Sequence, residues 1–94
     1  ENRRVLITGA GGSIGSEIAR IAATFHPQRL ILMERSENAL FEIDRQIARL
    51  FPRVPRVALL HDIADAEATR RLIGEQRPDV IFHAAAHKHV PLME

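Results

Sequence analysis

The stretch TGAGGSIG, residues Thr8 to Gly15, joins a strand pattern to a helix pattern. The residues before it, Val5 to Ile7, are apolar and mostly β-branched, which is typical of a buried strand. After it, apolar residues recur at helical spacing and predict one face of a helix: Ile14, Ile18, Ile21 and Phe25. The glycines of this stretch therefore lie on a turn from a strand to a helix.

Glycines on such a turn favour a phosphate site. Gly9, Gly12 and Gly15 carry no side chain, so backbone N–H groups can approach a phosphate, and the helix N-terminus adds partial positive charge. Spaced glycines alone are more typical of an ordinary turn. However, Glu34 follows the next apolar run and supplies the acidic residue that dinucleotide sites place there. The combined pattern predicts that a dinucleotide pyrophosphate binds at this turn.

Composition predicts one small globular unit without a basic or membrane-spanning segment. The 94 residues are 46% hydrophobic, and their 13 basic and 12 acidic residues are well mixed. No basic block with interleaved aromatic residues predicts a nucleic-acid partner, and no apolar stretch is long enough for membrane contact within these residues. The absence of cysteine fits a reducing compartment, and we expect a cytoplasmic location.

Strand and helix patterns alternate along the rest of the chain. Strands are expected at residues 4–8, 30–33, 57–60 and 80–83. Helices are expected at residues 13–25, 36–50 and 65–76, with Ser36 and Asp65 as N-caps of the last two. The inward faces of these two helices are expected to carry Leu40, Ile43, Ile47 and Leu50, and Ala68, Leu72 and Ile73.

Strands without alternation, separated by helices, predict a parallel sheet covered on both faces. Right-handed crossovers then give the strand order 3-2-1-4, the first half of a doubly wound Rossmann fold of the α/β class. Residues 1–94 are thus expected to form only the N-terminal part of an NAD(P)-binding domain. The outer edge of the fourth strand is then unpaired and apolar, which predicts self-association through that edge or marginal stability.

Polar residues follow the second and third strands at one edge of the sheet. Glu34 can accept hydrogen bonds from both adenosine ribose hydroxyls, which favours NAD because the carboxylate repels a 2′-phosphate. Arg35 and Ser36 could instead hold that phosphate, or be a solvated charge and a helix cap, so NADP stays possible. Asp62 could accept a hydrogen bond from the adenine amino group, while the Ile63 backbone bonds to the neighbouring ring nitrogen. Alternatively, Asp62 could be a turn aspartate.

The segment after the fourth strand supplies the last candidates. Small side chains at residues Ala84, Ala85 and Ala86 would let a cofactor pass close to the backbone, although alanines there also suit a buried helical position. Lys88 and His89 could reach a phosphate or hydroxyl, or belong to a solvated polar loop. The histidines of this segment have no nearby carboxylate or thiolate, so no metal site is predicted.

Three segments carry a resemblance to a known family: VLITGAGGSIGSEIAR, LILMERSENALFEID and DVIFHAAAHKHVPLME. Together they resemble the extended short-chain dehydrogenase/reductase superfamily. Within it they look like the CapD-type polysaccharide biosynthesis proteins, which are nucleotide-sugar 4,6-dehydratases and epimerases. The glycine turn identifies only the superfamily, whereas ERSENALFEID and AAAHKHVPLME are specific to the subgroup.

The resemblance implies a role for each candidate position. It implies that the cofactor pyrophosphate is lined by Gly9, Gly12, Ser13, Ile14 and Gly15. It implies that the adenosine end meets Glu34, Arg35, Ser36, Asp62 and Ile63. It further implies that the middle of the cofactor passes residues 84–86, with Lys88 near the nicotinamide ribose and the sugar nucleotide. His89, at the same edge of the sheet, is expected to contact the substrate as well.

Family members act on a UDP-linked N-acetylhexosamine. The bound cofactor removes hydride from C4, the ketone acidifies the C5 proton, water leaves from C6, and hydride returns to C6. The family's catalytic residues lie beyond the fourth strand and usually include a lysine paired with a tyrosine. This chain has no tyrosine, so its catalytic residues are expected beyond Glu94 and these residues alone are expected to be inactive. If the parent protein has an N-terminal membrane segment, the location would be the cytoplasmic face of the membrane.

Two other functions remain open from the sequence. One is a dinucleotide-binding module without catalysis. The other is an S-adenosylmethionine-dependent methyltransferase, which also combines a glycine-rich turn with an acid after the second strand. That class usually has an acid just before the first glycine, where this chain has Thr8, and this difference counts against it.

Overall fold

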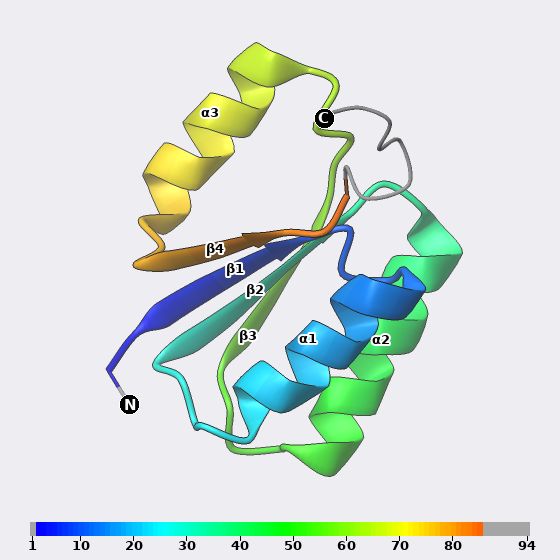
Figure 1. The fold of residues 1–94 in the computed structure, drawn as a ribbon, viewed down its shortest axis with the longest axis vertical. Coiled ribbons are helices and arrows are strands. Elements are labelled where there is room, and N and C mark those ends of the chain that lie inside the picture. Colours follow the sequence, from blue (N-terminus) through cyan, green and yellow to red (C-terminus); the bar gives the residue numbers. More distant parts are fainter. Residues whose placement is uncertain (1, 86–94) are drawn as a thin grey trace.

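Residues 2–85 are described by the computed structural model, and four parallel strands form their centre (Figure 1). The strands are β1 (Arg4–Thr8), β2 (Arg29–Glu34), β3 (Arg56–Leu60) and β4 (Val80–His83). The helices between them are α1 (Ser13–Ala23), α2 (Glu37–Leu50) and α3 (Ala66–Gln76). The sheet order is β3-β2-β1-β4, which confirms the predicted order and the α/β class.

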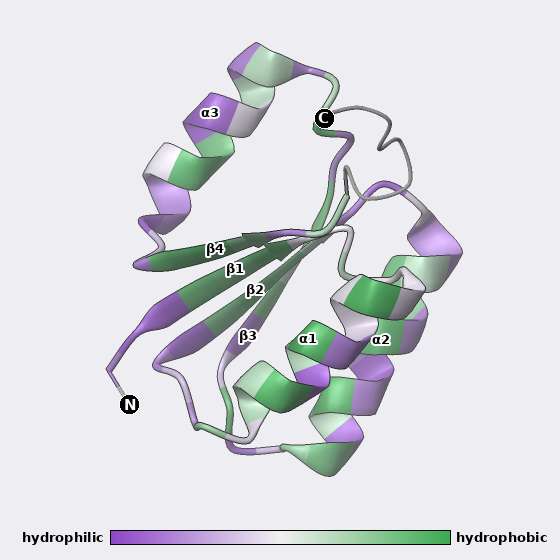
Figure 2. Cartoon of the chain, in the orientation of Figure 1, coloured by the Kyte–Doolittle hydropathy of each residue, from purple (hydrophilic) through white to green (hydrophobic). Residues whose placement is uncertain are grey.

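Helices cover both faces of the sheet, with α1 and α2 on one side and α3 on the other (Figure 1). The strands at the centre are the most hydrophobic part of the molecule (Figure 2). The larger core, beneath α1 and α2, consists of Val5, Ile7, Ala10, Ala19, Ala23, Leu30, Leu32, Leu40, Ile43, Ile47 and Val54. The smaller core, beneath α3, consists of Leu6, Ile31 and Met33. Because β1 and β2 are buried on both faces, their sequences are apolar throughout instead of alternating.

The predicted N-caps of α2 and α3 are confirmed. The Ser36 hydroxyl accepts a hydrogen bond from the Ala39 N–H at 3.3 Å, and the Asp65 carboxylate accepts one from the Ala68 N–H at 3.1 Å. Each satisfies a backbone donor that the first helical turn leaves without an intrahelical acceptor. These caps fix where both helices begin: α2 shortly after β2, and α3 after the loop of residues 61–65.

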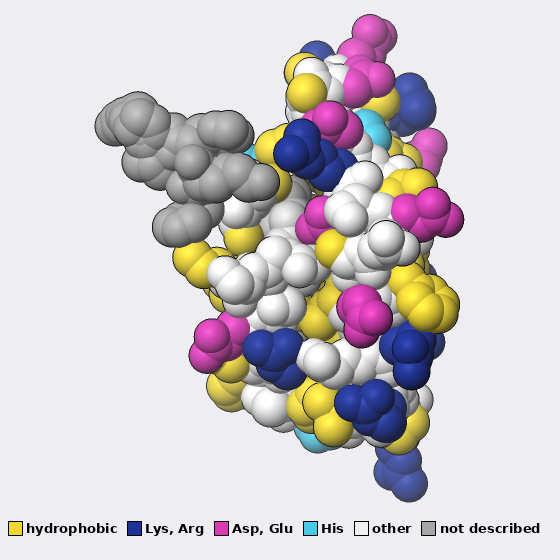
Figure 3. Space-filling view, turned by 90° about the vertical axis from the view of Figure 1, so that its right-hand side faces the viewer, with side chains coloured by type: hydrophobic (Ala, Val, Ile, Leu, Met, Phe, Trp, Pro, Cys, Tyr) yellow, Lys and Arg dark blue, Asp and Glu magenta, His cyan; other side chains and the backbone are white. Residues whose placement is uncertain are grey.

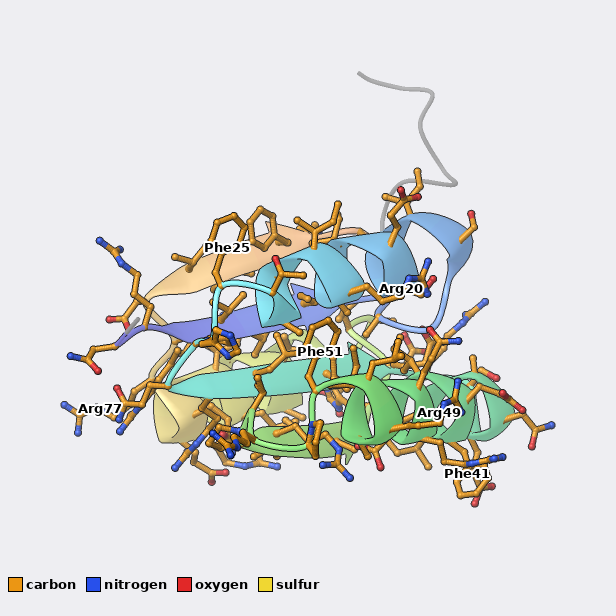
Figure 4. The ribbon with its side chains drawn as sticks, turned by 90° about the horizontal axis from the view of Figure 1, so that it is seen from below. Arg20, Phe25, Phe41, Arg49, Phe51 and Arg77 are labelled. Atoms are coloured by element: carbon orange, nitrogen blue, oxygen red, sulfur yellow. The ribbon has the colours of Figure 1, made fainter. Side chains whose placement is uncertain are left out.

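The predicted length of α1 was wrong, and its predicted apolar face is only partly buried. The helix ends at Ala23, before Phe25, and a turn follows in which the N–H of His26 donates to the Ala23 carbonyl at 3.1 Å. Its buried residues are the small ones: Gly15, Ala19 and Ala23. Small side chains let the helix approach the sheet closely, so Ile18 is only partly buried and Ile14 and Ile21 are exposed. Phe25 is 67% exposed and lies beside β4 at the end of α1 (Figure 4).

Two predictions about the other helices also need correction. Leu50 is half exposed because it is the last residue of α2, and Val54 in the following turn takes the buried position instead. No residue of α3 is fully buried, and Ala68, Leu72 and Ile73 are only half-buried. The cause is that α3 is the one described helix on its face of the sheet, so nothing packs beside it.

The edge strand β4 pairs with β1 and has no second strand partner among residues 2–85. Its side chains at Ile81 and Phe82 are 45% and 40% exposed, which confirms that this edge is apolar. Elsewhere the surface is mixed: the face in Figure 3 intersperses basic, acidic and apolar side chains. Within the described part of the chain, no helix is both long enough and apolar enough to cross a membrane.

Candidate functional site

A pocket of about 410 Å³ lies at the carboxyl edge of the sheet. All four strands contribute residues from their ends or from the loops just after them. The lining consists of Gly9, Gly12, Met33, Glu34, Arg35, His61, Asp62, Ile63, Ala64, Ala84 and Ala85. The direction of the strand connections reverses between β1 and β4, and open parallel sheets bind ligands at such a point.

The three glycines of the turn have different structural reasons to be glycine. Gly9 has φ +66°, and a Cβ there would lie 2.7 Å from the backbone N of Ala85. A Cβ on Gly15 would overlap the carbonyl oxygen of Gly9, so the start of α1 rests directly on the turn. A Cβ on Gly12 would meet only ordinary contact, 3.5 Å from the same oxygen. Packing therefore requires Gly9 and Gly15, whereas Gly12 keeps the pocket wall open at the start of the helix.

The N-terminus of α1 is available to an anion. Gly12 is the N-cap residue and provides no side-chain cap, and the first turn contains no acidic residue. The first N–H groups of a helix lack intrahelical acceptors and carry partial positive charge. Ser13 and Ile14 begin this helix next to the pocket, although their side chains do not line it. The backbone here has the arrangement that binds phosphate groups.

Glu34 is the buried acid of the site, with 9% of its surface exposed. Its Oε1 accepts a hydrogen bond from the Gly11 N–H at 2.8 Å, and its Oε2 accepts one from the Ser36 N–H at 3.0 Å. The carboxylate thus ties the glycine turn to the start of α2. Each carboxylate oxygen has a further lone pair, so both can also accept from ligand hydroxyls.

Gly11 belongs to the same arrangement and was missed by the sequence analysis. A Cβ on Gly11 would lie 2.5 Å from the Cβ of Ala39, so the turn packs against the first turn of α2. Only the extra glycine within the GAGG run signalled it. Ser36 acts as the cap of α2, one of its two expected roles, and Arg35 is exposed at the rim of the pocket.

The loop after β3 forms the opposite wall. The Asp62 carboxylate accepts a hydrogen bond from the Ala64 N–H at 2.9 Å, and the Asp65 N–H donates to the Asp62 carbonyl at 3.1 Å. Asp62 is therefore a turn aspartate, and it also lines the pocket with Ile63. A role in the turn thus does not exclude a contact with a ligand. His61 lines the pocket as well, and the sequence analysis did not single it out.

Thr8 connects β1 to the segment after β4. Its side chain is buried, and Oγ1 lies 2.9 Å from His83 Nδ1 and accepts a hydrogen bond from the Ala85 N–H at 3.3 Å. The Ala84 N–H donates to the Thr8 carbonyl at 3.2 Å. These contacts hold the small side chains of both alanines against the glycine turn, where they line the pocket. Ala86, Lys88 and His89 lie outside the described residues.

Metal-ligating side chains do not gather in the part of the chain that the structure covers. Among residues 2–85, no three His, Asp or Glu side chains are arranged to hold a metal ion. The pocket instead combines an uncapped helix start, a buried carboxylate and small side chains. This arrangement suits an elongated ligand that carries phosphate and hydroxyl groups.

Two curated proteins and one solved structure are similar to this chain. The capsular polysaccharide biosynthesis protein CapD of Staphylococcus aureus is 42% identical over 94 residues, which cover 99% of this chain and 16% of that protein. A UDP-N-acetylglucosamine 4,6-dehydratase (inverting) of Campylobacter jejuni is 33% identical over 98% of this chain and 26% of its own length. A short-chain dehydrogenase of Escherichia coli, solved as a complex with NADPH, superposes with a TM-score of 0.70 and 26% identity, covering 90% of this chain and 38% of that one.

The chain therefore spans only about a sixth to a quarter of the curated relatives it matches. A family model matches residues 5–94, from the first strand to Glu94. The match includes the glycine turn, the acid at the end of β2 and the loop after β3. The chain belongs to the family described as polysaccharide biosynthesis protein.

Proposed function

We propose that residues 1–94 are the N-terminal part of the NAD(P)-binding domain of a nucleotide-sugar 4,6-dehydratase or epimerase. The observation that carries this proposal is the pocket in which an uncapped helix start and the buried Glu34 carboxylate face one cavity. The names of the Campylobacter relative and the Escherichia coli neighbour support a UDP-N-acetylhexosamine substrate and a nicotinamide dinucleotide.

Each wall of the pocket has a proposed part in binding. The pyrophosphate would lie against the start of α1, at Gly9, Gly12, Ser13, Ile14 and Gly15. The adenosine end would lie between the ends of β2 and β3, at Glu34, Arg35, Ser36, Asp62 and Ile63. The small side chains of Ala84 and Ala85 leave room for the middle of the dinucleotide, and the same is proposed for Ala86.

Cofactor preference would depend on the charge of Glu34. Both carboxylate oxygens already accept backbone hydrogen bonds, which fixes the side chain at the end of β2. A fixed, buried negative charge beside the ribose favours its hydroxyls over a 2′-phosphate. We therefore propose NAD as the preferred cofactor, with NADP possible through Arg35 at the rim.

The bound nicotinamide would accept and return the hydride of the dehydratase reaction. The residues of this chain hold and orient it, and Lys88 and His89 are proposed to meet the sugar nucleotide. The catalytic residues are proposed to follow Glu94, and residues 1–94 alone are proposed to be inactive. The proposed location is the cytoplasm or the cytoplasmic face of a membrane.

Calorimetric titration with NAD⁺, NADP⁺ and S-adenosylmethionine tests the binding proposal. We expect both dinucleotides to bind, NAD⁺ more tightly, and S-adenosylmethionine to give no heat of binding. Tight S-adenosylmethionine binding without a dinucleotide response would identify the methyltransferase alternative. An assay of the longer polypeptide with UDP-N-acetylglucosamine then separates an enzyme from a dinucleotide-binding module without catalysis.

Self-association through β4 is a second property that these residues are proposed to have. The strand has no outer partner among residues 2–85, and Phe82 on it is 40% exposed. Phe82→Lys is expected to shift a concentration-dependent dimer to monomer in sedimentation velocity, because a lysine on an edge strand opposes strand pairing. Phe41→Lys is the matched control, since Phe41 points into solvent from α2, away from this edge (Figure 4). A wild-type chain that stays monomeric at high concentration would contradict the proposal.

A further inference from the structure

A hydrogen bond between side chains closes the loop that carries Asp62 and Ile63. His61 Nε2 lies 2.6 Å from Thr69 Oγ1. His61 directly follows β3, and Thr69 is the fourth residue of α3, so the bond spans the loop between strand and helix. The same hydroxyl also lies 3.5 Å from the Ile63 carbonyl oxygen, inside the loop.

The neighbours of the Thr69 hydroxyl favour a proton on the histidine side of this bond. The Thr69 hydroxyl has one proton, and Oγ1 lies 2.8 Å from the Asp65 carbonyl oxygen, which can only accept. When the hydroxyl donates to that carbonyl, its oxygen accepts from His61, and the His61 ring carries its proton at Nε2. This chain of two hydrogen bonds runs from the end of β3, through Thr69, to the residue that caps α3.

The histidine is itself anchored to the sheet. Its backbone N–H donates to the Glu34 carbonyl at 3.0 Å, which extends the pairing of β2 with β3 to the pocket edge. The helix at the other end of the loop is held less firmly, because none of its residues is fully buried. The contact between His61 and Thr69 therefore fixes the start of α3, and with it the loop, to the most rigid part of the fold.

We propose that His61 and Thr69 are positioning residues that set the adenine specificity of the pocket. The proposal rests on the proposed function, in which the Asp62 carboxylate accepts from the adenine amino group and the Ile63 N–H donates to the neighbouring ring nitrogen. Both groups belong to the loop that this side-chain bond closes, and both line the pocket. Hydrogen-bond readout of a base depends on such groups being held in place.

Nicotinamide hypoxanthine dinucleotide is the probe that separates this role from a general loss of stability. Hypoxanthine has a carbonyl where adenine has its amino group and an N–H where adenine has the ring acceptor. Both contacts are then opposed, and the wild-type chain is expected to bind NAD⁺ roughly tenfold more tightly than the analogue. Thr69→Val is expected to reduce this ratio to about twofold, because valine keeps the shape and removes the acceptor for His61. Thr69→Ser keeps the hydroxyl and is expected to retain the ratio.

Each result of this experiment bears on the proposal. If Thr69→Val has a wild-type circular dichroism spectrum and an unchanged ratio, the positioning role is overturned and the binding function stands. If the wild-type chain binds neither dinucleotide, both are overturned. If Thr69→Val does not fold, nitrogen-15 spectra of the wild-type histidine decide: the Nε2-protonated form supports the proposal, and a neutral ring protonated at Nδ1 overturns it.

Discussion

Gly15→Ala is expected to lower the melting temperature by about 12–24 °C. A Cβ at this position would overlap the Gly9 carbonyl oxygen and lie 2.7 Å from its carbonyl carbon, and both atoms are backbone. Neither the start of α1 nor the turn can move without losing the contact between them, so the cost is that of overpacking, about 3 kcal/mol. For a domain of this length, about 1 kcal/mol corresponds to 4–8 °C. Thermal unfolding followed by circular dichroism measures the effect.

Gly74→Ala is the matched control. Gly74 is an exposed residue inside α3, and a Cβ there would have no heavy atom within 4 Å. Alanine is the better helix former by about 0.5–1 kcal/mol, so this variant is expected to melt a few degrees higher than the wild type. The same substitution should therefore have opposite signs at the two glycines. A Gly15→Ala variant that melts within 3 °C of the wild type would contradict the close packing of α1 on the turn.

Local pattern was sufficient to predict the strands and their order. An apolar run before the glycine turn, an N-cap serine at residue 36 and an N-cap aspartate at residue 65 are short-range signals, and each appears in the structure as expected. Right-handed crossovers, together with the doubly wound pattern that the glycine turn indicates, then give the observed order of the four strands. The pocket follows from the same reasoning, because the carboxyl ends of parallel strands meet at one edge.

Other features depend on contacts between distant residues. Periodicity placed Ile21 and Phe25 on the apolar face of α1, yet the buried residues are Ala19 and Ala23, since only small side chains fit where the helix meets the sheet. A hydrophobicity pattern cannot show how closely two elements approach. The contact between Thr8 and His83 likewise joins residues 75 positions apart, and nothing in the local sequence pairs them.

The loss of the Glu34 carboxylate is expected to weaken NAD⁺ binding by roughly tenfold to hundredfold. In Glu34→Gln the amide can accept from only one of the two backbone donors, Gly11 N–H and Ser36 N–H, and its NH₂ group faces the other. A hydrogen bond to a charged group contributes about 1.5–3 kcal/mol, so the glycine turn loses its tie to α2 and the ribose loses a charged acceptor. NADP⁺ affinity should fall less, because the charge that opposes its 2′-phosphate is removed. Calorimetric titration with both dinucleotides measures the two affinities.

Glu37→Gln is the matched control for the loss of one negative charge and for the replacement of a carboxylate by an amide. Glu37 is an exposed acid in the first turn of α2, three residues from Glu34 and outside the pocket lining. Its substitution alters the same functional group near the same helix start, so a general electrostatic effect would change binding in both variants. We expect Glu37→Gln to bind NAD⁺ within about twofold of the wild type, because an exposed charge at a helix start contributes only a few tenths of a kcal/mol to 1 kcal/mol, and that to the stability of the helix. Equal losses in the two variants would mean that net charge governs binding. A loss of NAD⁺ affinity confined to Glu34→Gln would mean that the two backbone hydrogen bonds and the ribose contact govern binding.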